Sequence, residues 1–116
     1  MIDVSILTPA RNAALTIRRA IDSALSQDGV SVEVIVSENG STDDTRAMLS
    51  TIDDPRLHIL DSHADGVGAS LNECGEVATG RYFVELDADD WFAPDCLALL
   101  VAALDHAPSH VGFAHG

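Results

Sequence analysis

The amino-acid sequence predicts an α/β protein whose sheet is mostly parallel and carries helices on both faces. Short apolar runs rich in β-branched residues alternate with segments in which apolar residues recur at helical spacing. Such an alternation is typical of parallel sheets with a helix between successive strands. No repeat, low-complexity tract or linker interrupts the series, so we expect one domain over residues 1–116.

Two strands and two helices are expected in the first half of the chain. Ile17, Ile21 and Leu25 recur at helical spacing, whereas residues 32–36 form a β-branched run of the kind that strands prefer. The expected elements are a strand at 4–7 that ends at Pro9, a helix at 14–27 with Asn12 as its N-cap, a strand at 32–36, and a short helix that begins after the capping residues 41–44 and ends near Ile52.

The second half continues the same alternation. Pro94 suits the first turn of a helix, where its missing N–H is tolerated. The expected elements are a strand at 56–60, a helix at 67–79 closed by Gly80, a strand at 82–86, a helix from Pro94 to about His106, and the start of a fifth strand at 111–114.

The chain is strongly acidic. Nineteen Asp and Glu residues stand against six Arg and no Lys, which gives a formal net charge of −13. Nucleic acids and anionic membranes require a positive surface, so neither is an expected partner. A hydrophobic content of 47% also excludes a disordered chain. The lysine-free composition is compatible with a coding bias or with a salt-adapted surface.

The lack of a recognisable targeting signal and the context of the two cysteines indicate an ordinary intracellular domain. No apolar run approaches the roughly 18–20 residues of a transmembrane helix. The N-terminus Met1–Asp3 lacks the basic region and long apolar core of a signal peptide, so we expect a cytoplasmic location. Cys74 and Cys96 lie outside any CxxC or His/Cys cluster and are expected to be buried free thiols.

Polar residues follow each expected strand, at the edge where open α/β sheets bind ligands. Asp87, Asp89 and Asp90 form the most demanding group, because three carboxylates within four positions repel one another unless a cation or hydrogen bonds compensate. The spacing of Asp87 and Asp89 can aim two carboxylates the same way from an extended segment. The spacing leaves two interpretations open: solvated turn residues, or oxygen ligands of Mg²⁺ or Mn²⁺.

Four competing motifs fail on single residues. A calcium loop of the EF-hand type requires Gly where Phe92 stands and Glu where Ala98 stands. A DxDxT phosphatase nucleophile requires Thr in place of Trp91. Gly66-Val67-Gly68 is followed by Leu71 where a dinucleotide fingerprint has its third Gly, and a P-loop requires the lysine that the chain lacks.

Four blocks of the sequence together resemble the family-two glycosyltransferases of the GT-A type. The blocks are Val4–Asn12, Glu33–Thr45, Asp65–Asn72 and Gly80–Asp90. They occur in the family's order, and the resemblance extends from residue 4 to about residue 97. It implies a Rossmann-like sheet, the N-terminal half of a GT-A fold, that binds a nucleotide-diphosphate sugar through a divalent metal.

The resemblance also implies roles for individual residues. Thr8, Pro9, Ala10 and Arg11 match the loop that wraps the nucleoside of the donor. Glu38 and Asn39 match two acidic positions that read the base, usually uracil, so a UDP-sugar is the expected ligand. The family commonly has two Asp residues there, but a neutral Asn still hydrogen-bonds a base edge as donor or acceptor.

The acidic motif after the fourth expected strand matches the family's DxD motif, Asp87-Ala88-Asp89. The resemblance implies that Asp89 is the direct ligand of Mn²⁺ or Mg²⁺ and that Asp87 lies nearer the ribose or the metal's waters. The cation would join the acidic pocket to the diphosphate and stabilise the departing diphosphate as a Lewis acid. Leu71 stands where the family often has Arg, which increases the dependence on the metal.

Three lesser alternatives concern neighbouring residues. Arg11 either faces the ligand or forms a structural salt bridge. Trp91 and Phe92 are expected to pack beneath the loop that follows the DxD motif rather than to contact substrate. The five histidines show no metal-binding spacing and are expected to be ordinary surface or partly buried residues.

The expected function is donor binding by a glycosyltransferase of the inverting, metal-dependent type. Members of the family have a further segment that binds the acceptor and supplies the catalytic base, and no residue of this chain matches it. We therefore expect donor binding with little or no transfer. The alternatives are a non-catalytic nucleotide- or metal-binding module and a dimerising fragment, because the open edge of the fourth or fifth strand can pair with its symmetry mate in a homodimer.

Overall fold

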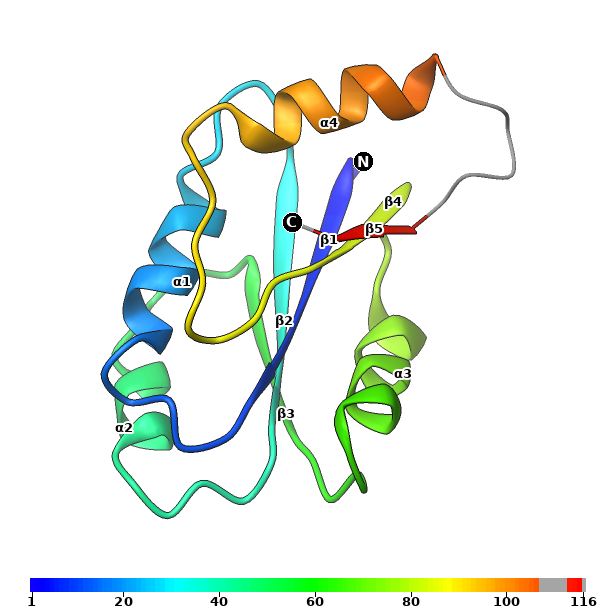
Figure 1. Ribbon diagram of the computed structural model, residues 1–116. Coiled ribbons are helices and arrows are strands. Elements are labelled where there is room, and N and C mark those ends of the chain that lie inside the picture. The colour runs from blue at the N-terminus through cyan, green and yellow to red at the C-terminus, as the bar shows by residue number, and fades with distance from the viewer. Residues whose placement is uncertain (107–112, 116) are drawn as a thin grey trace.

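The computed structural model describes residues 1–106 and, for the backbone alone, residues 113–115. Five strands form one parallel sheet in the order β3-β2-β1-β4-β5 (Figure 1). The α/β class and the parallel sheet are thus confirmed. The strands are β1 (Val4–Ala10), β2 (Val32–Glu38), β3 (Leu57–Asp61), β4 (Tyr82–Glu85) and β5 (Phe113–His115), and the helices are α1 (Ile17–Leu25), α2 (Thr45–Ser50), α3 (Val67–Val77) and α4 (Cys96–Asp105).

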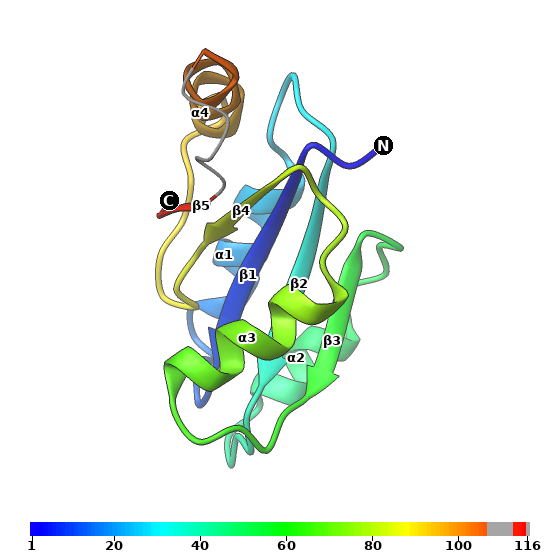
Figure 2. The ribbon, with the colours of Figure 1, turned by 90° about the vertical axis from the view of Figure 1, so that its right-hand side faces the viewer.

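Helices cover both faces of the sheet, as expected. Figure 2 shows α3 in front of the sheet and α1 and α2 behind it. The larger core lies on the α1 side, where Ile6 and Val34 pack with Ile17 and Ile21 of α1 and with Leu97 of α4. A smaller core lies beneath α3 and joins Leu7, Ile35 and Cys74. Neighbouring residues of β1 and β2 therefore serve opposite faces, as the alternation of a strand requires.

The strand β1 is longer than expected, because it runs through Pro9 to Ala10. The carbonyl oxygen of Leu7 accepts a hydrogen bond from Leu86 on the β4 side, whereas that of Ala10 accepts one from Asn39 on the β2 side. Residues two positions apart in a strand direct their backbone polar groups to the same neighbouring strand, so the nitrogen of Pro9, like the backbone of Leu7, faces the β4 side. The pairing with β4 ends at Leu7. The missing N–H of Pro9 therefore costs no ladder hydrogen bond.

The helix α1 begins later than expected, and Asn12 is not its N-cap. The N-cap is Thr16, and the preceding residues 14–16 form a turn. Asn12 instead adopts a left-handed conformation, with φ of 52°, and its side chain binds the loop after β2. Asn tolerates this conformation better than most residues do. Its side chain thus connects two loops. The spacing of apolar residues in the sequence does not predict such a contact.

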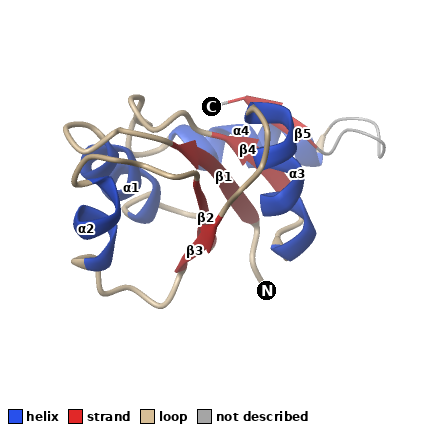
Figure 3. Ribbon diagram, turned by 90° about the horizontal axis from the view of Figure 1, so that it is seen from below, coloured by secondary structure: helices blue, strands red, loops and turns tan. Residues whose placement is uncertain are grey.

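The carboxyl ends of the parallel strands meet at one edge of the sheet, which Figure 3 views from below. The outer strands are β3 and β5, and β4 lies between β1 and β5. Of the two strands that we expected to offer an open edge, only β5 is therefore an outer strand. Residues 111 and 112 of the expected fifth strand lie outside the described residues.

None of the helices described in residues 1–106 combines the length and the apolar character that a bilayer crossing demands.

Candidate functional site

A pocket of about 270 Å³ lies at the carboxyl edge of the sheet. Three of its lining residues belong to the predicted site: Pro9 and Arg11 at the end of β1, and Asn39 at the end of β2. The remaining wall comes from the connection between β3 and α3 and from the first turns of that helix, namely Ala64, Asp65, Gly66, Val67 and Ser70. The structure thus brings together three strand ends, as ligand sites in open parallel sheets do.

The loop predicted to wrap a nucleoside is split between the pocket and the core. Pro9 and Arg11 line the pocket, whereas Thr8 and Ala10 are buried. The alternation of side chains along β1 accounts for the split. Thr8 Oγ1 has no hydrogen-bond partner among the described residues. Arg11 is exposed and forms no ion pair with any residue that the structure describes, so the salt-bridge alternative is not observed.

Asn39 is held in a defined orientation at the wall of the pocket. Its backbone N–H donates to the carbonyl oxygen of Ala10 over 3.0 Å, and its side-chain Nδ2 donates to the carbonyl oxygen of Ala64 over 2.7 Å. A carbonyl oxygen accepts only from the amide nitrogen, so this contact fixes which end of the amide is which. The side-chain Oδ1, an acceptor, receives no hydrogen bond from the described residues, and Nδ2 keeps one further N–H. Asn39 therefore offers a ligand the same kind of atom as a carboxylate does.

The loops that follow β1 and β2 are joined by hydrogen bonds. Asn12 N–H donates to Ser41 Oγ over 2.9 Å, and Asn12 Oδ1 accepts from the N–H of Thr42 over 2.8 Å. Ala13 N–H donates to Thr45 Oγ1 over 2.7 Å. The residues 41–44 were expected to cap α2, and Asp43 Oδ1 does accept from the N–H of Thr45, the first residue of this helix, over 2.9 Å, whereas the N-cap residue Asp44 makes no side-chain capping bond. Ser41 and Thr42 instead connect the two loops that carry Arg11 and Asn39.

Glu38 is not a wall of the pocket, although the resemblance implied that it reads the base. Its side chain is 0% exposed and lies on the α1 face of the sheet. Oε1 accepts from Ser41 N–H over 2.9 Å, and Oε2 accepts from Arg46 of α2. Burial alone would raise the pKa of Glu38, but the hydrogen bonds of Ser41 and the Arg46 cation outweigh it, and the pKa lies below its usual value.

The DxD residues lie on a separate loop, after β4 at the same edge of the sheet. Ala88 and Phe92 are buried in the larger core and anchor this loop. Asp87, Asp89 and the adjacent Asp90 are exposed. The chain turns sharply here, since Asp90 N–H donates to the carbonyl oxygen of Asp87 over 3.0 Å. Anchoring of Ala88 in the core explains why its two neighbours face the solvent.

Two polar residues fasten the same loop, Ser23 of α1 and Gln27 just after the end of that helix. Phe92 N–H donates to Ser23 Oγ over 3.0 Å. Gln27 Nε2 donates to the carbonyl oxygen of Ala93 over 2.6 Å, and its Oε1 accepts from Leu97 N–H over 2.9 Å. Neither Ser23 nor Gln27 was predicted from the sequence, because polar residues of the expected helix 14–27 ordinarily face the solvent.

The two aromatic residues after the DxD motif behave differently from each other. Phe92 packs into the core, as expected. Trp91 does not pack beneath the loop: it is 54% exposed, and the Arg19 guanidinium lies 4.0 Å from the centre of its ring. This cation–π contact stabilises an exposed indole.

Two carboxylates at this loop suit a cation that a ligand helps to hold. Among the described residues, no group of three or more His, Cys, Asp or Glu side chains converges as a metal site. Mg²⁺ and similar hard cations commonly bind through one or two carboxylates together with phosphate oxygens and waters. Asp87 and Asp89, both exposed, fit such a partial ligand set.

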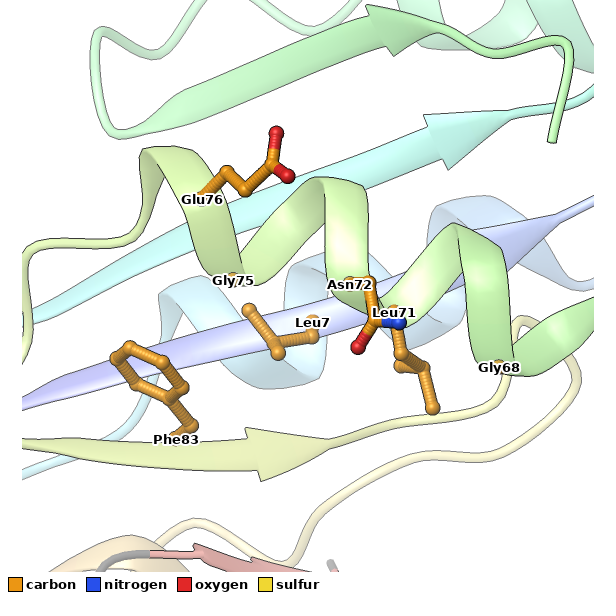
Figure 4. Close-up of a pocket in the computed structure, with 7 residues that line it drawn as sticks. All are labelled: Leu7, Gly68, Leu71, Asn72, Gly75, Glu76 and Phe83. Atoms are coloured by element: carbon orange, nitrogen blue, oxygen red, sulfur yellow. The ribbon is translucent and has the colours of Figure 1, made fainter.

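A second cavity lies on the α3 face of the sheet, between α3 and β4 (Figure 4). It has a volume of about 650 Å³, and Leu7, Leu71 and Phe83 give it an apolar lining. Gly68 and Gly75 of α3 leave it open. None of the predicted site residues lines it, so size alone does not identify the site.

Comparisons with known proteins agree with these observations. The protein-family model described as "Glycosyl transferase family 2" matches residues 5–114. The succinoglycan biosynthesis protein ExoO of Rhizobium meliloti is 39% identical over 110 residues, which are 94% of this chain and 32% of that protein. The chondroitin synthase of Pasteurella multocida is 38% identical over 98 residues, 83% of this chain and 10% of that protein.

Solved structures share the fold. TarS of S. aureus (residues 1–349, in complex with UDP-GlcNAc) matches with a TM-score of 0.79 and 25% identity over 89% of this chain and 31% of that chain. The mannosyltransferase PcManGT of Pyrobaculum calidifontis, in complex with GDP-Man and Mn²⁺, matches with a TM-score of 0.70 and 28% identity over 89% of this chain and 33% of that one. The chain thus spans a third or less of the length of each of these four relatives.

Proposed function

Because the chain belongs to glycosyl transferase family 2, we propose that it forms the donor-binding part of a glycosyltransferase and holds a nucleoside-diphosphate sugar at the carboxyl edge of its sheet. The observation that carries the proposal is the meeting of three strand ends at one pocket, with Arg11 and Asn39 in its wall. Relatives with this fold were solved with UDP-GlcNAc and with GDP-Man and Mn²⁺, which supports a ligand of this class.

The nucleoside binds between Arg11 and Asn39 in this proposal. Asn39 presents Oδ1 as an acceptor, because the bond from Nδ2 to the carbonyl oxygen of Ala64 orients the amide and no described residue donates to Oδ1. An acceptor that faces the ring nitrogen of the pairing edge suits uracil and guanine, which carry an N–H there, better than adenine and cytosine, whose ring nitrogen is itself an acceptor and whose pairing-edge donor is the exocyclic amino group. Uracil is the base that we propose, in agreement with the bound ligands of TarS. Arg11, without an ion pair among the described residues, offers its cation to the nucleotide.

The diphosphate is held through a divalent cation, Mn²⁺ or Mg²⁺, at Asp89 with Asp87 nearby. The loop after β4 presents both carboxylates to the solvent at the same edge of the sheet. The cation, when bound, supplies Lewis-acid stabilisation to the diphosphate. Ala88 and Phe92 hold the loop in place beneath these side chains. The chain's contribution is therefore binding and orientation, which is the larger part of catalysis in group transfer from a phosphate ester.

Calorimetry with nucleotides tests this proposal. We expect UDP to bind in the presence of Mn²⁺ and to bind more tightly than ADP or CDP, whereas Mn²⁺ alone gives little heat because two carboxylates are a partial ligand set. Asp89→Ala is expected to weaken metal-dependent binding by about tenfold or more. Asp53→Ala is the matched control, since it removes one exposed carboxylate from the connection that precedes β3, at the opposite edge of the sheet.

Two results would overturn the proposal: binding of UDP that is the same with and without metal, or equal losses in Asp89→Ala and Asp53→Ala. Transfer is a separate matter. No residue of this chain is assigned as a catalytic base, so we expect little turnover of UDP-sugars by the 116 residues alone. A homodimer through the outer strand β5 also stays a prediction, and light scattering measures it directly.

A further inference from the structure

A cluster of three charged side chains joins the carboxyl ends of β2 and β3 to α2. We refer to Glu38, Arg46 and Asp61 as the charged clamp. Arg46 Nη2 donates to Glu38 Oε2 and, over 2.8 Å, to Asp61 Oδ1. Glu38 and Asp61 are paired residues in the register of β2 and β3. A single guanidinium thus holds together the ends of two neighbouring strands.

The charged clamp lies where the loops of the pocket begin. Asn39 directly follows Glu38, and the segment with Ala64 to Val67 follows Asp61 three residues later. The backbone supports the same junction, since Ser62 N–H donates to the carbonyl oxygen of Glu38 over 2.8 Å and Ala64 N–H donates to Ser62 Oγ over 3.0 Å. The carbonyl oxygen of Ala64 then receives Asn39 Nδ2.

A second series of contacts leads from Glu38 to the loop of Arg11. Glu38 Oε1 accepts from Ser41 N–H, and Ser41 Oγ accepts from Asn12 N–H, next to Arg11. Each side of the pocket is therefore connected to Glu38 through one or two hydrogen bonds. Both of its oxygens are used within the protein, and its side chain is fully buried.

We propose that Glu38, Arg46 and Asp61 position the loops that form the nucleotide pocket, and that Glu38 acts through these loops rather than by touching the base. The inference rests on the proposed function, because the pocket is the one assigned to the donor. A buried carboxylate needs a cation and hydrogen bonds to remain charged, and here Arg46 and Ser41 provide them. The same contacts fix the positions of Asn39 and Arg11, which reduces the ordering that a ligand would otherwise impose.

Four variants and, for the choice of base, Glu38→Gln test the charged clamp by calorimetry with UDP and Mn²⁺. Asp61→Asn removes its exposed arm, which leaves the buried Glu38–Arg46 pair in place and the fold intact. Arg46→Met removes the cation, and Arg46→Lys is the conservative rescue. Arg56→Met is the matched control, because the Arg56–Asp54 pair has the same 2.8 Å contact near the start of β3, away from the pocket. Thermal unfolding of each variant without nucleotide runs in parallel.

We expect Asp61→Asn and Arg46→Met to weaken binding of UDP with Mn²⁺ by about threefold to tenfold, with Arg46→Lys between Arg46→Met and the parent chain. Arg56→Met is expected to change the unfolding temperature but not the dissociation constant. Amide exchange at Ser41 and Asn12, measured without nucleotide, is expected to become faster in Asp61→Asn and to stay unchanged in Arg56→Met.

The outcomes separate this proposal from the one on which it rests. If the parent chain does not bind UDP with Mn²⁺, the donor assignment fails. If the parent chain binds and Asp61→Asn binds equally well with unchanged amide exchange, the charged clamp has no positioning role. A third result also contradicts positioning: a change in the preference for UDP over GDP in Glu38→Gln, with unchanged exchange at Ser41, would place Glu38 on the base itself.

Discussion

Two adjacent residues at the carboxyl end of β2 have opposite surroundings, although the resemblance gave them one role. Asn39 lines the pocket, whereas Glu38 lies in the core on the α1 face. The alternation of a strand accounts for the difference, because Glu38 shares its face with Val34 and Val36. All seven residues of β2 are buried, so the sequence of this strand carries no contrast between an inner and an outer face. A motif can thus locate a site without telling which of its residues touch the ligand.

The thiol of Cys74 illustrates how strongly burial changes a residue's chemistry. Its side chain is fully buried, and burial together with the nearby Glu73 carboxylate raises the pKa of Cys74 to about 11. Cys96, by contrast, is half-buried. The sequence prediction of two buried free thiols is therefore confirmed for Cys74 and only in part for Cys96.

We expect Cys74 to resist thiol reagents in the folded protein. Only about one thiol in a thousand is ionised at pH 8 when its pKa is about 11, and the thiolate is the reacting form. In a Cys96→Ser variant, the remaining thiol should react with a disulfide reagent at least about a hundredfold more slowly than in denaturant. The rate should rise with pH, because the deprotonated fraction rises. Rapid labelling of the folded variant at pH 8 would contradict this.

At the scale of the elements, a polar network fastens the amino end of the sheet. Ser5 Oγ donates to Glu33 Oε2 over 2.6 Å, and Thr79 N–H donates to the same oxygen over 2.7 Å. Gly80 N–H donates to Ser5 Oγ over 2.7 Å, which fixes the start of β4 beside β1. Burial alone would raise the pKa of Glu33, but the hydrogen bonds of Ser5 and Thr79 lower it below its usual value. The network connects β1, β2 and the segment before β4.

This network makes Gly80 sensitive to substitution. A Cβ atom at Gly80 would lie 2.6 Å from Ser5 N and 2.9 Å from the carbonyl carbon of Val4, both of which are backbone atoms. We expect Gly80→Ala to lower the free energy of unfolding by about 1–3 kcal/mol, measured by urea unfolding.

Gly75→Ala is the matched control for Gly80→Ala. Its Cβ would lie 3.8 Å from Phe83 Cε2, an ordinary contact, within the helix α3. Because alanine suits a helix interior better than glycine, the variant should be more stable than the parent by about 0.5–1 kcal/mol. If the two variants changed stability alike, the close approach of β1 to Gly80 would not be the cause.

The elements themselves were largely predictable, and their connections were not. Each expected strand and helix that falls within the described residues is present, because the two hydrophobic periods and the turn residues mark them. The boundaries moved where a backbone contact decided them, as at Pro9 and Asn12. The role of Arg46 was not predictable from its own position, since an arginine on a short helix is ordinarily solvated. Its partners are the acids at the ends of β2 and β3, Glu38 and Asp61, which the fold brings to it.

At the scale of the whole molecule, the net charge of −13 leaves most acidic side chains without a basic partner. Four of the six arginines, namely Arg18, Arg46, Arg56 and Arg81, form ion pairs with acids of the described residues. Most of the 19 acidic side chains form no ion pair with an arginine within residues 1–106, among them Asp87, Asp89 and Asp90. Repulsion among these carboxylates opposes the compact state. It is concentrated in the loop after β4, at the proposed metal site.

This imbalance predicts that salt stabilises the nucleotide-free protein. Raising NaCl from about 0.02 M to about 0.5 M shortens the Debye length from about 20 Å to about 4 Å, which screens repulsion across the whole surface. Exposed ion pairs also weaken, but each contributes about 1 kcal/mol at most. We expect the unfolding temperature to rise by about 3 °C or more at pH 8. At acidic pH, where protonation removes part of the carboxylate charge, the rise should shrink. A fall in unfolding temperature with salt at pH 8 would mean that the few ion pairs, and not the repulsion among unpaired acids, dominate the electrostatics of the fold.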